Sequence, residues 1–184
     1  MTAHITKVTW SQLPSFTFPD RMAKYVLDNV FDYDFSLLAI TSSEPDYKIC
    51  IHFNRQLNLG LVRESDVDLK VKNMKTPLTF ACFRFEDEEN FHEYELLANR
   101  SINSVSTAEK TTSAPSLFDE ESPADIKGYL VPELAQYDYL LLLKGEGHET
   151  LAREVQPELK KIIFVQAIQV VDLENLASKK NLLI

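Results

Sequence analysis

Runs of apolar residues along the chain predict a fold that is rich in strands. The continuous apolar run at 35–41 and the leucine-rich run at 138–143 are typical of buried strands. Residues 77–102 alternate between apolar and polar positions on both sides of a polar turn at 86–90, which predicts an antiparallel hairpin with a five-residue loop. The run at 162–171 alternates in its second half and indicates the last strong strand.

Two helices are expected between these strands. In the stretch 43–60, Ser43 is the expected N-cap, Asp46 stands at capping-box spacing, and Gly60 is expected to end the helix. Its apolar residues make one stripe of Tyr47, Cys50, Ile51 and Leu57, which Ile49 and Phe53 widen. This width predicts a helix that is covered on two sides. A second helical stretch is expected at 148–162.

The order of these elements predicts an α+β domain. Strand–helix–strand units occur around 35–71 and 138–171, and they flank the hairpin. We therefore expect a two-layer sandwich, with a mainly antiparallel sheet of five to seven strands and two principal helices on one face. A ferredoxin-like or related arrangement suits this order. A chain of 184 residues is long enough for one such domain.

The ends and the middle of the chain suggest its organisation. We expect a single domain over 22–184, interrupted by a low-complexity insert at 103–126 that is rich in Ser and Thr. Residues 1–21 have no clear periodicity and allow two interpretations: a peripheral strand-and-loop arm that contains Trp10, or an extension upstream of a misassigned start.

Charge and composition exclude several classes of partner. The chain has 28 acidic and 19 basic residues, which gives a net charge of −9. Because phosphate backbones and anionic lipids attract basic patches, binding to nucleic acid or to a membrane surface is disfavoured. No apolar run approaches the length of a membrane span, and no secretory signal opens the sequence. The sequence therefore predicts a cytoplasmic protein.

The reactive residue types form no recognisable catalytic or metal-binding motif. The cysteines Cys50 and Cys82 stand alone among apolar neighbours, which predicts two buried, reduced thiols. His148 begins "HETLARE", but Ala152 stands where a zinc protease would need its second histidine. The Gly-x-Gly at 144–150 lacks the third glycine of a dinucleotide site and is interpreted as a turn. We therefore predict no metal and no cofactor, and the sequence disfavours an enzyme.

A cluster of acidic residues surrounds the predicted hairpin turn. Glu93 and Glu95 follow the segment "EDEEN" at 86–90. These carboxylates could hold a hard cation, but the segment lacks the glycine and the staggered oxygens of a calcium loop. The favoured interpretation is a hairpin tip that water solvates, because like charges prefer water.

The segment "VPELAQYDY" at 131–139 resembles the signature of the IPExxxVDY family, bacterial proteins of unknown function. Four positions match at the family's spacing: Pro132, Glu133, Asp138 and Tyr139. Val131 replaces the family's isoleucine, and Tyr137 in place of valine is the departure. The resemblance runs from about Met22 to the C-terminus, which favours the misassigned start. It implies a shared fold but no activity, cofactor or catalytic residue.

Two functions follow from these patterns. The first is a non-enzymatic binding or interaction module, which contacts a protein partner or a second copy of itself through a sheet face or through "SLFDEE" at 116–121. The alternative is a small-molecule-binding or catalytic domain with Glu133, Asp138 and Tyr139 facing a pocket. Carboxylates that converge on one pocket would favour the alternative. Carboxylates that bind backbone amides or basic side chains of the same domain would favour the first.

Overall fold

A computed structural model describes residues 33–71, 76–106 and 125–183. The expectations for residues 1–21, and for 107–124 within the insert, fall outside these ranges. The bounds of the strands are β1 Phe35–Thr41, β2 Val62–Arg63, β3 Val67–Leu69, β4 Leu78–Phe80, β5 Cys82–Asp87, β6 His92–Ala98, β7 Arg100–Ser106, β8 Asp125–Tyr129, β9 Tyr139–Lys144 and β10 Ala167–Val171. The helices are α1 Asp46–Leu57 and α2 His148–Leu159, and the 3-10 turns are η1 Pro132–Leu134, η2 Leu173–Asn175 and η3 Lys179–Leu182.

Six strands form the main sheet in the order β10-β1-β9-β6-β5-β2, and every neighbouring pair is antiparallel. Since β1 and β6 both run antiparallel to β9, they are parallel to each other with β9 between them. By the same reasoning, β9 and β10 are parallel with β1 between them. The chain therefore contains two split β-α-β units, the arrangement of a ferredoxin-like sheet, with β5 and β2 added beyond β6.

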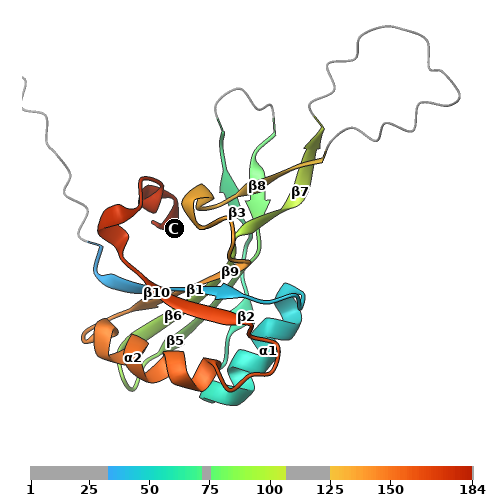
Figure 1. The fold of residues 1–184 in the computed structure, drawn as a ribbon. Coiled ribbons are helices and arrows are strands. Elements are labelled where there is room, and N and C mark those ends of the chain that lie inside the picture. Colours follow the sequence, from blue (N-terminus) through green and yellow to red (C-terminus); the bar gives the residue numbers. More distant parts are fainter. Residues whose placement is uncertain (1–32, 72–75, 107–124, 184) are drawn as a thin grey trace, which may run out of the picture. The chain divides into compact units, whose positions relative to one another are not determined.

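Both helices cover one face of the sheet, as Figure 1 shows. Helix α1 contributes Ile49 and Phe53 to this core, and α2 contributes Val155 and Leu159. The predicted α+β sandwich with two principal helices on one face is confirmed. No helix in the described ranges is both long and apolar enough to cross a membrane.

The opposite face of the sheet is also covered, by irregular segments. Leu130 and Leu134 from the segment between β8 and β9, and Leu176 and Leu182 from the C-terminal segment, pack there against the central strands. Coverage on both faces explains why the run at 35–41 is apolar without alternation, since its side chains are buried on either side.

Helix α1 differs from the sequence prediction at both ends. Pro45, not Ser43, occupies the N-cap position, and no side chain caps the helix there. At the other end Asn58, with a φ of 53°, adopts the left-handed conformation that ends the helix before Gly60. Asparagine tolerates this conformation better than most residues, so the glycine is not needed for the cap.

The expected coverage of α1 on two sides is wrong among the described residues. Cys50 and Phe53 are buried, whereas Tyr47 is 55% exposed and Ile51 is 45% exposed. The helix therefore buries one narrow stripe against the sheet and presents apolar side chains on its outer side.

Candidate functional site

The signature segment is organised by one buried asparagine. Asn99, which follows β6, is fully buried. Its side-chain nitrogen donates to the carbonyl oxygens of Leu134 and Tyr137, at 2.8 and 3.0 Å. Its side-chain oxygen accepts from the backbone N–H of Val131 at 2.9 Å. One side chain thus satisfies three backbone groups of a segment that has few ladder hydrogen bonds of its own.

Glu133 lies in η1 and faces the C-terminal turns. Its Oε1 accepts a hydrogen bond from the backbone N–H of Ser178 at 2.9 Å. Burial alone would raise the pKa of this carboxyl, but hydrogen bonds from its own backbone N–H and from Ser178 outweigh burial and lower the pKa. Glu133 therefore joins the signature segment to the C-terminal segment as a carboxylate.

Asp138 binds two other parts of the domain. Its Oδ2 accepts from the backbone N–H of Ser42 at 3.0 Å, just after β1. Its Oδ1 lies 2.9 Å from Nη2 of Arg100, at the start of β7. The carboxylate therefore connects the end of one central strand to the base of the β7–β8 pair.

Tyr139 is buried at the first position of β9. Its hydroxyl donates to the carbonyl oxygen of Glu44 at 2.5 Å. Burial raises the pKa of Tyr139 to about 12, and the carboxylates of Asp46 and Asp138 act in the same direction. The phenol is therefore neutral and serves as a hydrogen-bond donor.

The structure brings Asp138 and Tyr139 together at the segment 42–44, while Glu133 lies against Ser178. A hollow of about 320 Å³ is lined by Glu133 together with other side chains, but not by Asp138 or Tyr139. Both carboxylates bind backbone N–H groups of the same domain, and Asp138 also binds an arginine. This arrangement favours a structural role for the signature.

The raised pKa of Tyr139 predicts a change in stability with alkaline pH. The unfolded phenol ionises near its ordinary value of 10.0, whereas the folded phenol keeps its proton up to about 12. The contribution of Tyr139 is therefore present below pH 10 and is lost as pH rises through the folded pKa. Urea unfolding should give the wild type a higher free energy of unfolding than Tyr139→Phe at about pH 8, and this difference should shrink at about pH 11. An equal difference at both values would contradict this assignment.

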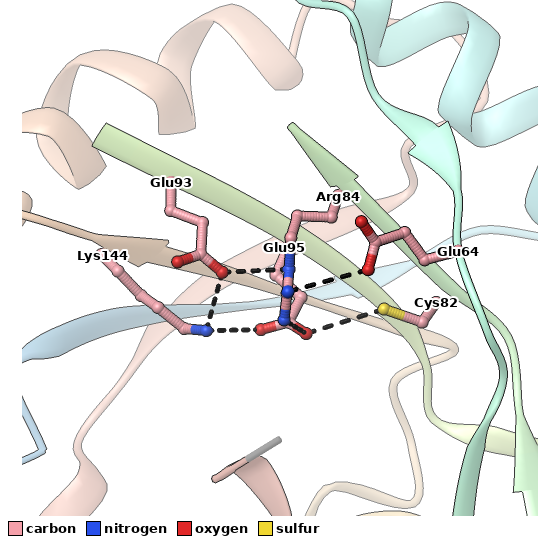
Figure 2. A network of polar contacts seen from close by, with 6 residues as sticks. All are labelled: Glu64, Cys82, Arg84, Glu93, Glu95 and Lys144. Carbon is pink, nitrogen blue, oxygen red and sulfur yellow. Dashed lines mark hydrogen bonds and ion pairs between the residues drawn. The ribbon is translucent and has the colours of Figure 1, made fainter. Parts of the chain in front are cut away.

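A second polar cluster lies on the sheet face away from the helices (Figure 2). Glu95 in β6 is fully buried, and its neighbours Tyr94 and Leu96 point to the helix face. Its Oε1 lies 3.1 Å from Nη2 of Arg84 in β5, and its Oε2 lies 2.7 Å from Nζ of Lys144 in β9. Three adjacent strands therefore place two cations on one buried carboxylate.

Glu93 completes this cluster at a more exposed position. Its Oε1 lies 3.0 Å from Nζ of Lys144 and 3.1 Å from Nε of Arg84. The contact to Nε is an ion pair whose angle does not make a hydrogen bond, since this buried nitrogen has no hydrogen-bond partner among the described residues. Glu64 approaches Arg84 at 3.7 Å. The prediction of a solvated acidic tip is therefore wrong for Glu95, because cross-strand cations stabilise its charge inside the protein.

The chemistry available to this cluster is limited. Burial raises the pKa of the Cys82 thiol to about 12, and the adjacent Glu95 carboxylate adds to the effect. Since the thiolate is the nucleophilic form, Cys82 is inert near neutral pH. Burial alone would lower the pKa of Lys144, but its bonds to Glu95 and Glu93 raise it. Across the described residues, no three His, Cys, Asp or Glu side chains are placed to hold a metal ion.

Apolar side chains gather on the outer side of the helix layer, and we call this surface the helix-layer patch. It consists of Tyr47, Ile51, Ile163 and Phe164, which are 55%, 45%, 88% and 37% exposed. Tyr47 and Ile51 are four residues apart and share one side of α1. The ring of Phe164 lies 4.9 Å from that of His52, so the segment after α2 reaches α1.

A third polar arrangement joins β1 to α2. Ser36 Oγ lies 2.8 Å from Nδ1 of His148, and Nε2 of His148 lies 3.1 Å from Oδ1 of Asp34. The sequence did not predict this set of contacts, because Ser36 and His148 are 112 positions apart. The nearest sequence signal is His148 at the start of a predicted helix, and nothing around it in the sequence indicates a contact with a serine.

The chain was also compared with known proteins. Scans against protein-family models, curated proteins and solved structures each found no match.

Proposed function

We propose that this chain is a protein-interaction module that docks a partner on the helix-layer patch. The observation that carries the proposal is the exposure of four large apolar side chains, two on α1 and two on the segment after α2, where the rings of His52 and Phe164 meet. Contiguous exposed apolar side chains on a folded domain are typical of interaction surfaces, because water disfavours them.

The charges beside the patch support a partner that is both apolar and acidic. Arg55 stands one helical turn after Ile51 on the same side of α1, and Lys160 comes three residues before Ile163. Both basic side chains belong to exposed residues. They contrast with the net charge of −9 for the whole chain. An amphipathic acidic segment would therefore bury its apolar side on the patch and place its carboxylates beside these cations.

Two further expectations accompany this proposal. We place the chain in the IPExxxVDY family on the four matching positions of its signature. We also place the module in the cytoplasm, where two buried, reduced cysteines are common.

Site-specific photo-crosslinking in cells tests the proposed docking surface. A photoreactive phenylalanine analogue at Ile51 is expected to capture a partner, and the same analogue at Ile163 should capture the same partner. Val62 is a matched control, because it is 62% exposed but lies on β2. The substitution Arg55→Glu should abolish capture at Ile51, since it places a like charge against an acidic partner.

The outcomes of this experiment separate the possible occupants. Capture of one acidic protein at Ile51 and Ile163, but not at Val62, supports the proposal. Capture of a second copy of this chain would replace the acidic partner with self-association. Equal capture at all three positions, or capture that survives Arg55→Glu, would overturn the docking surface.

A further inference from the structure

The hydrogen-bonded series Asp34–His148–Ser36, which we call the relay, resembles a Ser-His-Asp triad in its geometry. Ser36 lies on β1, and Asp34 stands two residues before it, just outside the strand. His148 is the first residue of α2 and contacts both, at 2.8 Å from Ser36 Oγ and 3.1 Å from Asp34 Oδ1. Figure 1 shows the start of α2 beneath the start of β1.

These contacts determine which ring nitrogen of His148 carries the proton. An ionised carboxylate can only accept a hydrogen bond, so Nε2 of His148 must donate to Asp34. In the neutral ring, Nδ1 then keeps its lone pair and accepts the hydroxyl proton of Ser36. This is the protonation state of the histidine in a Ser-His-Asp triad, although the two ring nitrogens exchange roles here.

A hollow beside the relay provides room for a small substrate. Its volume is about 530 Å³, within the usual range for small-molecule sites. Ser36 and His148 line it together with Ala152, Arg153 and Val170. Val170 offers an apolar surface that is 43% exposed. The lining also includes the charged residues Glu149 and Asp172, so the part that suits a short acyl group is the apolar side formed by Val170 and Val171.

A purely structural role explains only part of this arrangement. The bond between Ser36 and His148 is enough to fix α2 to the sheet. The side chain of Asp34 is 79% exposed, and an exposed pair of this kind adds little to stability. What the contact to Asp34 does is orient the histidine ring and select its tautomer, which matters for proton transfer.

We propose that Ser36 is the nucleophile of an acyl-transfer site for small carboxylic esters, beyond the interaction role above. Ser36 Oγ attacks the ester carbonyl carbon while its proton moves to Nδ1 of His148. The bond to the leaving oxygen then breaks, and the alcohol departs with that proton. Water attacks the acyl-serine by the same route, which releases the carboxylic acid and restores Ser36. Asp34 acts as a positioning residue through His148.

Labelling of the full chain with a fluorophosphonate probe tests this proposal. Mass spectrometry should find the phosphonyl group on Ser36, and hydrolysis of p-nitrophenyl acetate should accompany the labelling. His148→Gln is expected to slow labelling by about 100-fold or more, in the range of general-base catalysis. Ser42→Ala is a matched control and should label at the wild-type rate. Ser42 is also buried, but its hydroxyl accepts from the backbone N–H of Glu44.

A second variant separates positioning from folding. Asp34→Asn changes an exposed side chain, so the domain should stay folded, while labelling slows by about tenfold or more because the tautomer is no longer fixed. For p-nitrophenyl acetate, kcat should fall by a similar factor while KM stays within about twofold, because Asp34 acts through His148 and does not line the hollow. Absence of label on Ser36 in the wild type, or equal rates in wild type and His148→Gln, would overturn the proposal.

Discussion

Replacing Glu95 with glutamine is expected to lower the free energy of unfolding by about 3 kcal/mol, because it leaves two cations without their buried counter-charge. Glu95 is fully buried and lies within 3.1 Å of both Arg84 and Lys144. Glutamine keeps the shape of the side chain, so the loss reports on charge and not on a cavity. Urea unfolding measures the difference in free energy between the two proteins. The slope of that free energy with urea concentration should be the same for both.

Glu93→Gln is the matched control for this prediction. Glu93 contacts the same two cations, Arg84 and Lys144, but its side chain is 28% exposed. Because water screens an exposed ion pair, this substitution should cost less than about 1 kcal/mol. If Glu93→Gln and Glu95→Gln lowered the free energy of unfolding equally, the burial of Glu95 would not explain its contribution to stability.

Replacing Asn99 with alanine is expected to cost a similar amount, about 3 kcal/mol or more. The substitution leaves the N–H of Val131 and the carbonyl group of Tyr137 without their side-chain partner. The carbonyl group of Leu134 loses one of two hydrogen bonds, since it still accepts from the N–H of Tyr137. Each buried backbone group that loses its hydrogen bond destabilises the folded state by about 1–3 kcal/mol. Chemical denaturation gives the global loss, and amide hydrogen exchange at Val131 should become faster in the variant.

Asn175→Ala controls for the loss of an asparagine as such. Asn175 is exposed and donates to the side chain of Asp172 in its own turn. This variant should change the free energy of unfolding by less than about 0.5 kcal/mol. If Asn99→Ala were as mild, the signature segment would not depend on its central asparagine.

Local patterns in the sequence were sufficient for the central strands β1 and β9 and for the class of fold, but not for β7 and β8, which overlap the predicted insert at 103–126. The run at 35–41 matches β1 at both ends, and the run at 138–143 differs from β9 by one residue at each end. Buried strands are recognisable because an apolar run is a property of neighbouring residues. The helix caps were harder, because Pro45 and Asn58 replaced the expected Ser43 and Gly60.

The polar sites were not predictable because they depend on distant residues. Glu95 stands among exposed acids in the sequence, and only the pairing of β6 with β5 and β9 gives it Arg84 and Lys144. Asn99 is 35 positions from Leu134, and Ser36 is 112 positions from His148. No local pattern carries these contacts.

We have proposed that the helix-layer patch carries the function, whereas the contacts of Glu133, Asp138 and Tyr139 favour a structural role for the segment 131–139. One experiment tests both statements. For Asp138→Asn and for Tyr47→Ser it measures the free energy of unfolding and the photo-crosslinking yield per folded molecule. We predict that Asp138→Asn lowers stability and leaves capture at Ile51 unchanged, because the Asp138 side chain binds Ser42 and Arg100 and, among the described residues, no other group. Tyr47→Ser should keep stability and lose capture, since Tyr47 is 55% exposed. The opposite pattern, with capture lost on changing Asp138 and retained on changing Tyr47, would contradict the account.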